Sequence, residues 1–461
     1  MHLPSSIVIA ADSAATPIIA VRAASLSATL TALDADARAW AAANAFNAKP
    51  DSVLIVPGAD GRIAHVLAGI DDVDDPHAFG TLPFALPEGR YCLHPTLGER
   101  IEPARALLGW GLAAYRFTRY RALKREPATL VLNPNAQDLD EAFAQLEGCL
   151  RVRNLVNTPT QDMGPEHLEA ETRELAARFG ATVRSISGDA LLEENFPAIH
   201  AVGRASHRAP RLIELSWGDA AHPQLVLVGK GVCFDTGGLD IKPSDGMRNM
   251  KKDMGGAAHA IALAGLIMQQ RLSVRLRLLV PAVENAIGPD AYRPGEVIAT
   301  RKGISVEIDN TDAEGRIVLC DALAYAAEDQ PDLILDFATL TGAARVALGP
   351  DLPALFANDE AVAAGWIEAG EHLRDPVWRM PLWRPYLRYL NSHVADIANA
   401  GSRMAGAVTA ALYLEKFIPE DQRWAHLDVY AWNDGDRPGR PRGGEAMALR
   451  SAFAMLKARY G

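Results

Sequence analysis

The chain has few cysteines and no long hydrophobic run. Its four cysteines lie far apart, and none belongs to a C-x-x-C pair: Cys92, Cys149, Cys233 and Cys320. This spacing argues against a disulfide framework or a zinc ribbon, and it is expected of a protein in a reducing cytoplasm. No apolar run reaches the roughly 18 residues that a membrane-spanning helix needs. The first residues also lack the basic and apolar regions of a secretory signal, so we expect a cytoplasmic protein with no membrane partner.

An excess of positive charge is missing as well. The sequence has 46 Lys and Arg against 57 Asp and Glu, a formal net charge of −11. Nucleic-acid-binding proteins and polybasic membrane anchors usually carry a basic excess, so neither is the expected class. The 461 residues are 49% hydrophobic and 22% charged. This is an ordinary globular composition, and at roughly 150 residues per domain it allows about two to four domains.

Several common enzyme signatures are absent. The chain has no H-E-x-x-H helix, no G-x-S-x-G elbow and no G-x-x-x-x-G-K-[ST] loop. The segment VGKGVCFD at 228–235 follows an apolar run and superficially suggests a nucleotide-binding turn. Phe234, however, stands where the third glycine of G-x-G-x-x-G should fall, which weakens that interpretation.

The alternation of apolar runs and helical patterns predicts two α/β regions. Residues 1–150 combine short β-rich runs with Ala-rich helical stretches and end in a helix at about 138–156. From 157 to 461, apolar strands alternate with helices, which is typical of a mainly parallel or mixed sheet covered by helices on both faces. The strands expected here cover 224–228, 274–280, 303–308, 332–337 and 426–432, and the helices 255–270 and 315–328. We place the domain boundary along the helix at 138–156.

Acidic side chains cluster after these apolar strands. They are Asp235, Asp240, Asp253, Asp312 and Glu314, with Lys230 and Lys242 nearby. Groups at the carboxyl ends of strands collect at one edge of an α/β sheet, where active sites tend to lie. Carboxylates gathered there would repel one another unless cations neutralise them, and a pair of divalent ions is a known device for hydrolysis.

Each of these residues also has a plainer interpretation. The sequence from Thr311 to Glu314 fits a capping box before a helix that starts near Gly315. Asp253 taken alone is a surface acid, and Lys230 taken alone belongs to a solvated turn. Only the group as a whole favours chemistry.

Four further segments stand out: VGKGVCFDTGGLDIKPS at 228–244, MKKDMGGAA at 250–258, NTDAEGR at 310–316 and ATLTGA at 338–343. Together they resemble the leucyl aminopeptidase, or cytosol aminopeptidase, family. The heptad NTDAEGR is that family's signature, and the four segments occur in the family's order. The resemblance extends from about Asn157 to the end, so it implies that 157–461 is a catalytic metallopeptidase domain.

The resemblance implies a role for each matching residue. Five would hold two divalent metal ions, for which zinc or manganese is expected: Lys230, Asp235, Asp253, Asp312 and Glu314. Lys242 would contact the scissile carbonyl, and Arg316 would hold a bicarbonate ion. Five more would line the substrate cleft: Met250, Asn310, Thr339, Leu340 and Gly342. The sequence departs from the family at 429–432, where Val-Tyr-Ala-Trp replaces the usual Ile-Ala-Gly, and this bears on side-chain preference.

The resulting prediction is a metal-dependent aminopeptidase that releases N-terminal residues from peptides with a free amine. By resemblance, it would be a homohexamer. Two alternatives from other classes are a DNA-binding or regulatory relative, against which the net charge of −11 counts, and a scaffold without metal or activity, against which the complete set of site residues counts.

Overall fold

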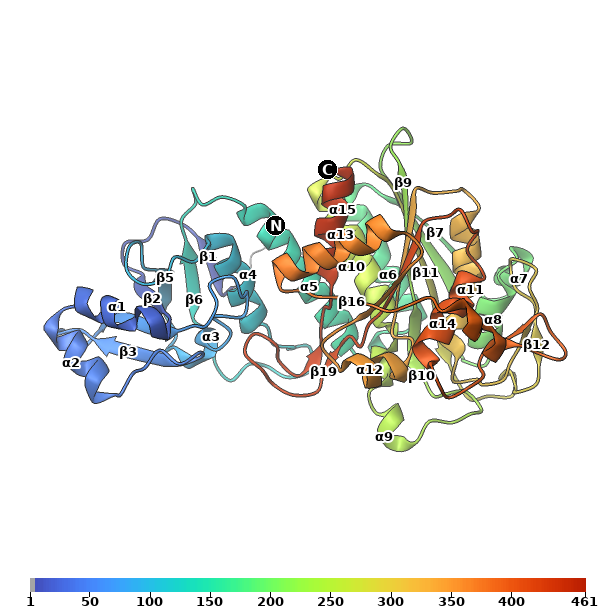
Figure 1. The fold of residues 1–461 in the computed structure, drawn as a ribbon, viewed down its shortest axis with the longest axis horizontal. Coiled ribbons are helices and arrows are strands. Elements are labelled where there is room, and N and C mark those ends of the chain that lie inside the picture. The colour runs from blue at the N-terminus through green and yellow to red at the C-terminus, as the bar shows by residue number, and fades with distance from the viewer. Residues whose placement is uncertain (1–4) are drawn as a thin grey trace. The chain divides into compact units, whose positions relative to one another are not determined.

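The computed structural model describes residues 5–461 (Figure 1). By its internal contacts the chain divides into two compact units. The first contains residues 1–150 together with 433–443, and the second contains 151–432 together with 444–461. Helix α5 (Leu139–Asn157) crosses the division. None of the helices described between residues 5 and 461 is both long and apolar enough to cross a bilayer.

The first unit is built on a six-stranded sheet. Its strands are β1 (Ile7–Ile9), β2 (Thr16–Val21), β3 (Val53–Pro57), β4 (Ile63–Gly69), β5 (Arg90–Leu93) and β6 (Thr129–Leu132). Their order is β1-β6-β5-β2-β4-β3, and every neighbouring pair is parallel except β3 with β4. The helices are α1 (Leu26–Ala32), α2 (Ala35–Ala43), α3 (Leu82–Ala85) and α4 (Pro103–Ala114), with a 3-10 turn η1 at Ala23–Ser25. Apolar side chains of α2, such as Ala37 and Ala41, pack on Val21 and Leu67 of the sheet.

The second unit is built on a nine-stranded mixed sheet. Its strands are β7 (Thr182–Ser187), β8 (Arg211–Trp217), β9 (Gln224–Gly229), β10 (Gly231–Asp235), β11 (Arg275–Asn285), β14 (Leu333–Ala338), β15 (Ala354–Ala357), β16 (Trp378–Arg379) and β18 (Trp424–Asp428). The order is β16-β15-β18-β14-β9-β11-β8-β7, with β10 beside β11. The central strands β11, β9, β14 and β18 are parallel. Strand β8 runs antiparallel to both its neighbours, and β15 runs antiparallel to β18 but parallel to β16. The expected α/β class with a mixed sheet is therefore confirmed.

Helices cover both faces of this sheet (Figure 1). One face carries α6 (Pro165–Phe179), α10 (Gly255–Gln270), α13 (Glu360–Leu373) and α15 (Leu449–Tyr460), and the other carries α8 (Pro197–Gly203), α11 (Glu314–Ala327) and α14 (Gly406–Glu415). The strands are buried on both faces, which explains their unbroken apolar runs. Helix α10 can approach β14 closely because it begins with glycines: a Cβ on Gly256 would lie 2.1 Å from the Phe337 carbonyl oxygen.

The remaining elements are short. They are η2 (Thr160–Asp162), α7 (Ala190–Glu193), α9 (Ser244–Met247), η3 (Met250–Met254), β12 (Val297–Ile298), β13 (Val306–Glu307), α12 (Gly342–Leu348), η4 (Arg384–Leu390), β17 (Ile397–Ala398), β19 (Trp432–Asn433) and β20 (Gly443–Gly444).

Two strand predictions differ from the structure. The strand expected over 303–308 is reduced to the two residues of β13. The strand expected over 426–432 instead occupies Trp424–Asp428. Its extended path ends because Asp428 turns to bind the loop after β14, and Ala431 has a left-handed backbone with φ of 56°.

Candidate metal centre and substrate pocket

Side chains from several parts of the sequence meet at one edge of the second unit's sheet. Lys230 follows β9, Asp235 ends β10 and Thr339 follows β14, and these strands end at a common edge because they run in the same direction. Helix α11 begins there with Glu314, and Asp253 lies in η3, just before α10. The carboxyl edge of an open α/β sheet is its usual ligand-binding edge.

Lys230 is buried at the centre of this group. Its Nζ atom lies 2.8 Å from Asp253 Oδ2 and 2.8 Å from Glu314 Oε1, and it donates to the Thr339 carbonyl oxygen at 2.9 Å. Burial by itself lowers the pKa of Lys230, but the nearby carboxylates outweigh it and hold the pKa above its usual value. Without a metal ion beside it, Lys230 therefore carries a positive charge that balances these carboxylates. The solvated-turn interpretation of Lys230 is wrong.

Lys242 approaches the acidic group from the loop after β10. Its Nζ atom lies 2.8 Å from Asp235 Oδ2 and forms a second ion pair with Asp312. Burial lowers the pKa of Lys242. The charges of Asp235, Glu314 and Asp312 raise it by a larger amount, so the pKa lies above its usual value. Lys242 therefore presents a positive charge to the same cluster from the side of the loop.

The carboxylates have the spacing of a metal site. One oxygen each of Asp235, Asp312 and Glu314 lies within 4.8 Å of the others. With Asp253 the group carries four acids against two lysines, a formal charge of −4 + 2 = −2. Burial, followed by the charge of Asp235, raises the pKa of Glu314 well above its usual value and that of Asp312 to about 6. A buried set of hard oxygen donors that resists ionisation in this way fits divalent cations.

A hydrogen-bond network joins the two loops that carry these acids. Asp235 Oδ1 accepts from Gly237 N and from Asn285 Nδ2, each at 2.8 Å. The same amide also donates to the Thr311 carbonyl oxygen at 3.1 Å, and Tyr292 donates its hydroxyl to that oxygen at 2.6 Å. These bonds fix the Asp235 carboxylate and the segment before Glu314 against each other.

The capping-box interpretation of Thr311 to Glu314 is wrong. Helix α11 begins at Glu314 with Ala313 as its N-cap, and no side chain caps it. The Thr311 hydroxyl instead donates to the Gly237 carbonyl oxygen at 2.6 Å, and its backbone N–H donates to Asp240 Oδ2 at 2.8 Å. Thr311 thus binds the loop after β10 and does not cap the helix, so Glu314 is not part of a capping box and faces the cluster. Asp253, too, is buried and is not a surface acid.

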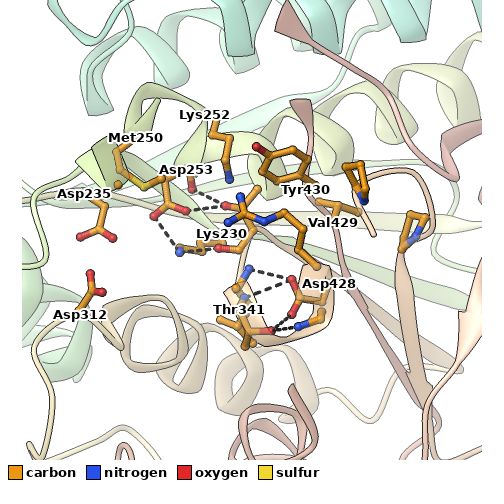
Figure 2. A pocket seen from close by; sticks show the side chains of 18 of the residues that line it. Lys230, Asp235, Met250, Lys252, Asp253, Asp312, Thr341, Asp428, Val429 and Tyr430 are labelled. Carbon is orange, nitrogen blue, oxygen red and sulfur yellow. Dashed lines mark hydrogen bonds and ion pairs between the residues drawn. The ribbon is translucent and has the colours of Figure 1, made fainter. Parts of the chain in front are cut away.

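A cavity of about 310 Å³ opens beside the cluster (Figure 2). Its wall contains the five proposed metal ligands and Lys242, together with Met250, Thr339, Leu340 and Gly342. Figure 2 shows Asp235, Asp312, Lys230 and Asp253 on one side of this space. The structure thus brings ten of the twelve residues singled out from the sequence to one pocket.

Two of those residues lie outside the cavity wall. Arg316 is buried in α11 and donates from Nη1 to the Asn399 carbonyl oxygen at 2.7 Å. Burial lowers the pKa of its guanidinium. Asn310 binds the same neighbour, because its carbonyl oxygen accepts from Asn399 Nδ2 at 2.7 Å. Through Asn399, both residues therefore hold the 310–316 segment in place on the side away from the cavity wall.

Several residues of the pocket wall were not singled out from the sequence. They are Lys252, Thr341, Arg345, Asp428 and Tyr430. Burial lowers the pKa of Lys252 to about 8. The departure from the family pattern at 429–432 was a signal for Tyr430, whereas nothing in the sequence pointed to Arg345.

Acids and lysines gathered at the carboxyl edge of an α/β sheet, beside an open pocket, indicate a metal-dependent hydrolase. Comparison with known proteins gives the family. Residues 151–452 match the cytosol aminopeptidase family, catalytic domain, and residues 16–133 match the M17 aminopeptidase N-terminal domain. The chain belongs to the cytosol aminopeptidase family and is a metallo-aminopeptidase, which confirms the predicted family, fold and activity.

Individual relatives agree with this assignment. The chain is 40% identical over 363 residues to a probable cytosol aminopeptidase of Syntrophotalea carbinolica, covering 75% of this chain and 73% of that one. Its structure is similar to that of the cytosol aminopeptidase from Coxiella burnetii, with a TM-score of 0.96, 48% identity and coverage of 99% and 100%. It is also similar to the bottromycin maturation enzyme BotP in complex with Mn, with a TM-score of 0.87, 32% identity and coverage of 99% and 100%.

Proposed function

We propose that the enzyme removes N-terminal residues from peptides with the help of two divalent ions. The proposed ligands are Lys230, Asp235, Asp253, Asp312 and Glu314. The observation that carries the proposal is the convergence of these five side chains, from segments up to 84 positions apart, on one buried cluster beside a cavity. When bound, the two ions would polarise the scissile carbonyl and lower the pKa of water.

The side chains of the cluster have distinct tasks in this proposal. The charges of Asp235 and Glu314 act on both lysines, and these two carboxylates would be shared by the two ions. Lys230 and Asp253 would complete the site at which the peptide's free amine is held, and Asp312 would complete the other. Beside two dications Lys230 would lose its proton and offer a nitrogen lone pair, since nearby positive charge disfavours an ammonium.

Positive side chains would stabilise the charge that develops during the reaction. Lys242 lies between Asp235 and Asp312 at the pocket wall and would face the carbonyl oxygen as it becomes negative. Arg316 would hold a bicarbonate ion. In the described chain its buried Nε atom has no hydrogen-bond partner, and a small anion would supply one.

The peptide itself would lie along the cavity. Met250, Thr339, Leu340 and Gly342 line its wall and would contact the N-terminal residue. Asn310 lies outside the cavity wall and would contribute indirectly, by holding the segment that carries Asp312.

Other features of the enzyme follow from its relatives. We propose zinc or manganese as the metal, and the manganese complex of BotP supports the latter. The name shared by the relatives supports a cytoplasmic location. A homohexamer and a domain boundary near residues 150–157 also belong to the proposal, and the division of the chain into compact units at 150/151 supports that boundary.

One experiment tests the proposed function directly. The purified full-length enzyme should hydrolyse leucyl-4-nitroanilide, lose activity with a chelator and regain it with Mn²⁺ or Zn²⁺. N-acetyl-leucyl-4-nitroanilide should not be cleaved, because the blocked amine cannot bind at Asp253 and the metal. Full activity after metal removal, or cleavage of the blocked substrate, would contradict the proposal.

A further inference from the structure

One wall of the peptide pocket carries an ammonium group that has no hydrogen-bond acceptor among the described residues. Lys252 is only 6% exposed and lines the pocket next to Asp253. Within residues 5–461 its ammonium makes no hydrogen bond and no ion pair; its contact is with the Tyr430 ring, whose centre lies 4.8 Å away (Figure 2). The pocket gives this ammonium little access to water, so a ligand that brings it a hydrogen-bond acceptor is favoured there.

A second cation lies at the same end of the pocket. Arg345 extends from the exposed side of α12, and its Cζ atom lies 4.7 Å from the centre of the same Tyr430 ring. Both cations line the pocket, and neither is among the proposed metal ligands. The aromatic ring attracts both charges through its face while leaving their N–H groups available to other partners.

The acid at this end is already engaged. Asp428 accepts from Leu340 N at 3.0 Å, from Thr341 N at 3.3 Å and from the Thr341 hydroxyl at 2.7 Å. Its carboxylate is therefore turned toward the loop after β14. Two cations and one acid leave a formal charge of +2 − 1 = +1 at this end, whose remaining donors belong to Lys252 and Arg345.

We propose that Lys252 and Arg345, together with the ring of Tyr430, form a subsite that binds a carboxylate group of the peptide. The inference rests on the proposed function, which places the free amine at Asp253. Lys252 and Asp253 line the same pocket and lie beside each other in Figure 2, so a peptide whose amine is held at Asp253 would bring the side chain of its N-terminal residue to Lys252. The enzyme accordingly prefers peptides that begin with Glu or Asp. A carboxylate at the C-terminus of a short peptide has the same chemistry and is the alternative source.

The test compares glutamyl- and glutaminyl-4-nitroanilide, which have nearly the same shape and differ in charge. Neither has a C-terminal carboxylate. The metal-loaded enzyme should have a kcat/KM for the glutamyl substrate higher by roughly tenfold or more, the effect expected of a charge-assisted hydrogen bond. Lys252→Met and Arg345→Met should each move this ratio toward one. Arg345 is exposed, so its variant keeps the test valid if Lys252→Met unfolds. Arg275→Met, at an exposed position outside the pocket, should keep the wild-type ratio.

A second comparison separates the two carboxylate sources. If the subsite binds a C-terminus, Lys252→Met and Arg345→Met will weaken cleavage of Leu-Gly relative to Leu-Gly-amide and leave the glutamyl-to-glutaminyl ratio unchanged. That outcome overturns the preference for an acidic N-terminal residue. A wild-type ratio of one or less, with normal cleavage of leucyl-4-nitroanilide, overturns the inference alone. Failure to cleave any of these substrates overturns the proposed function and this inference together.

Discussion

At the scale of single residues, the two lysines of the acidic cluster, Lys230 and Lys242, have different surroundings although both neutralise acids. Lys230 is enclosed, with Asp253, Glu314 and a backbone carbonyl oxygen around its nitrogen. Lys242 reaches in from a loop and remains beside the cavity. This difference suits Lys230 to a fixed ligand position and Lys242 to contact with the substrate.

Lys242→Ala should therefore reduce turnover more than substrate affinity. Losing one donor to a developing oxyanion typically lowers kcat by about 10²–10³. Steady-state kinetics and metal analysis on the same preparation will check this, with both ions expected to remain bound. Unimpaired turnover in a variant that keeps both ions would refute the assigned role.

Gly315→Ala should inactivate the enzyme although alanine is the better helix former. A Cβ at this position would lie 2.6 Å from Lys230 Cε and 2.7 Å from its Nζ atom, so the lysine would have to leave its ion pairs with Asp253 and Glu314. The gain in helix propensity is at most about 1 kcal/mol, which is smaller than the cost of displacing a paired, buried lysine. Activity and thermal melting measure the result. Gly365→Ala in α13 is the matched control, because its nearest neighbour would be at 3.5 Å.

At the scale of elements, one buried acid in α11 holds the start of α8. Asp321 Oδ2 accepts from Ala198 N at 2.8 Å and Ile199 N at 3.3 Å, and Oδ1 accepts from Arg301 N at 2.8 Å. The N-cap residue of α8, Phe196, makes no side-chain cap, so this carboxyl supplies the acceptor from another helix.

Asp321→Ala should lower the free energy of unfolding by on the order of 3 kcal/mol, because three buried N–H donors lose their acceptor.

Burial raises the pKa of Asp321 to about 7, against about 3.9 in an unfolded chain. The folded state then binds more protons, so this group's contribution to stability falls as pH rises from about 4 to about 7, by at most about 1.4 kcal/mol per pH unit, and is constant above. Melting temperatures of the wild type and Asp321→Asn across pH 5–8 will test this. The amount by which the wild type melts above the variant should decrease as pH rises. A pH-independent difference would contradict it.

At the scale of the whole molecule, divalent metal should stabilise the fold as well as activate the enzyme. The cluster carries a formal charge of −2 on buried and half-buried groups, and an ion that binds only the folded state adds about 2.7 kcal/mol at a hundredfold excess over its Kd. Thermal melting with a chelator and then with Mn²⁺ or Zn²⁺ should show an increase of several degrees. Asp312→Asn, which removes one proposed ligand, should reduce that increase, and an unchanged melting temperature in the wild type would argue against a structural contribution of the metal.

The sequence by itself determined the fold class and the family. Apolar runs such as 224–228 and 332–337 are buried on both faces in the structure, and such runs mark the central strands of a covered sheet. The signature heptad at 310–316, with the three other segments, indicated the aminopeptidase family without any coordinates. Such features can be predicted from the sequence because buried strands and short motifs are patterns of neighbouring residues.

Only the tertiary structure decided how distant segments meet. Thr311 fits a helix cap locally, but it binds the loop after β10 because that loop lies beside it in the fold. Lys252, Arg345 and Tyr430 come from three separate segments and share one pocket wall. Their proximity depends on the order of the strands in the sheet and on the ends at which the helices begin. Those are long-range properties that the spacing of residues along the chain does not encode.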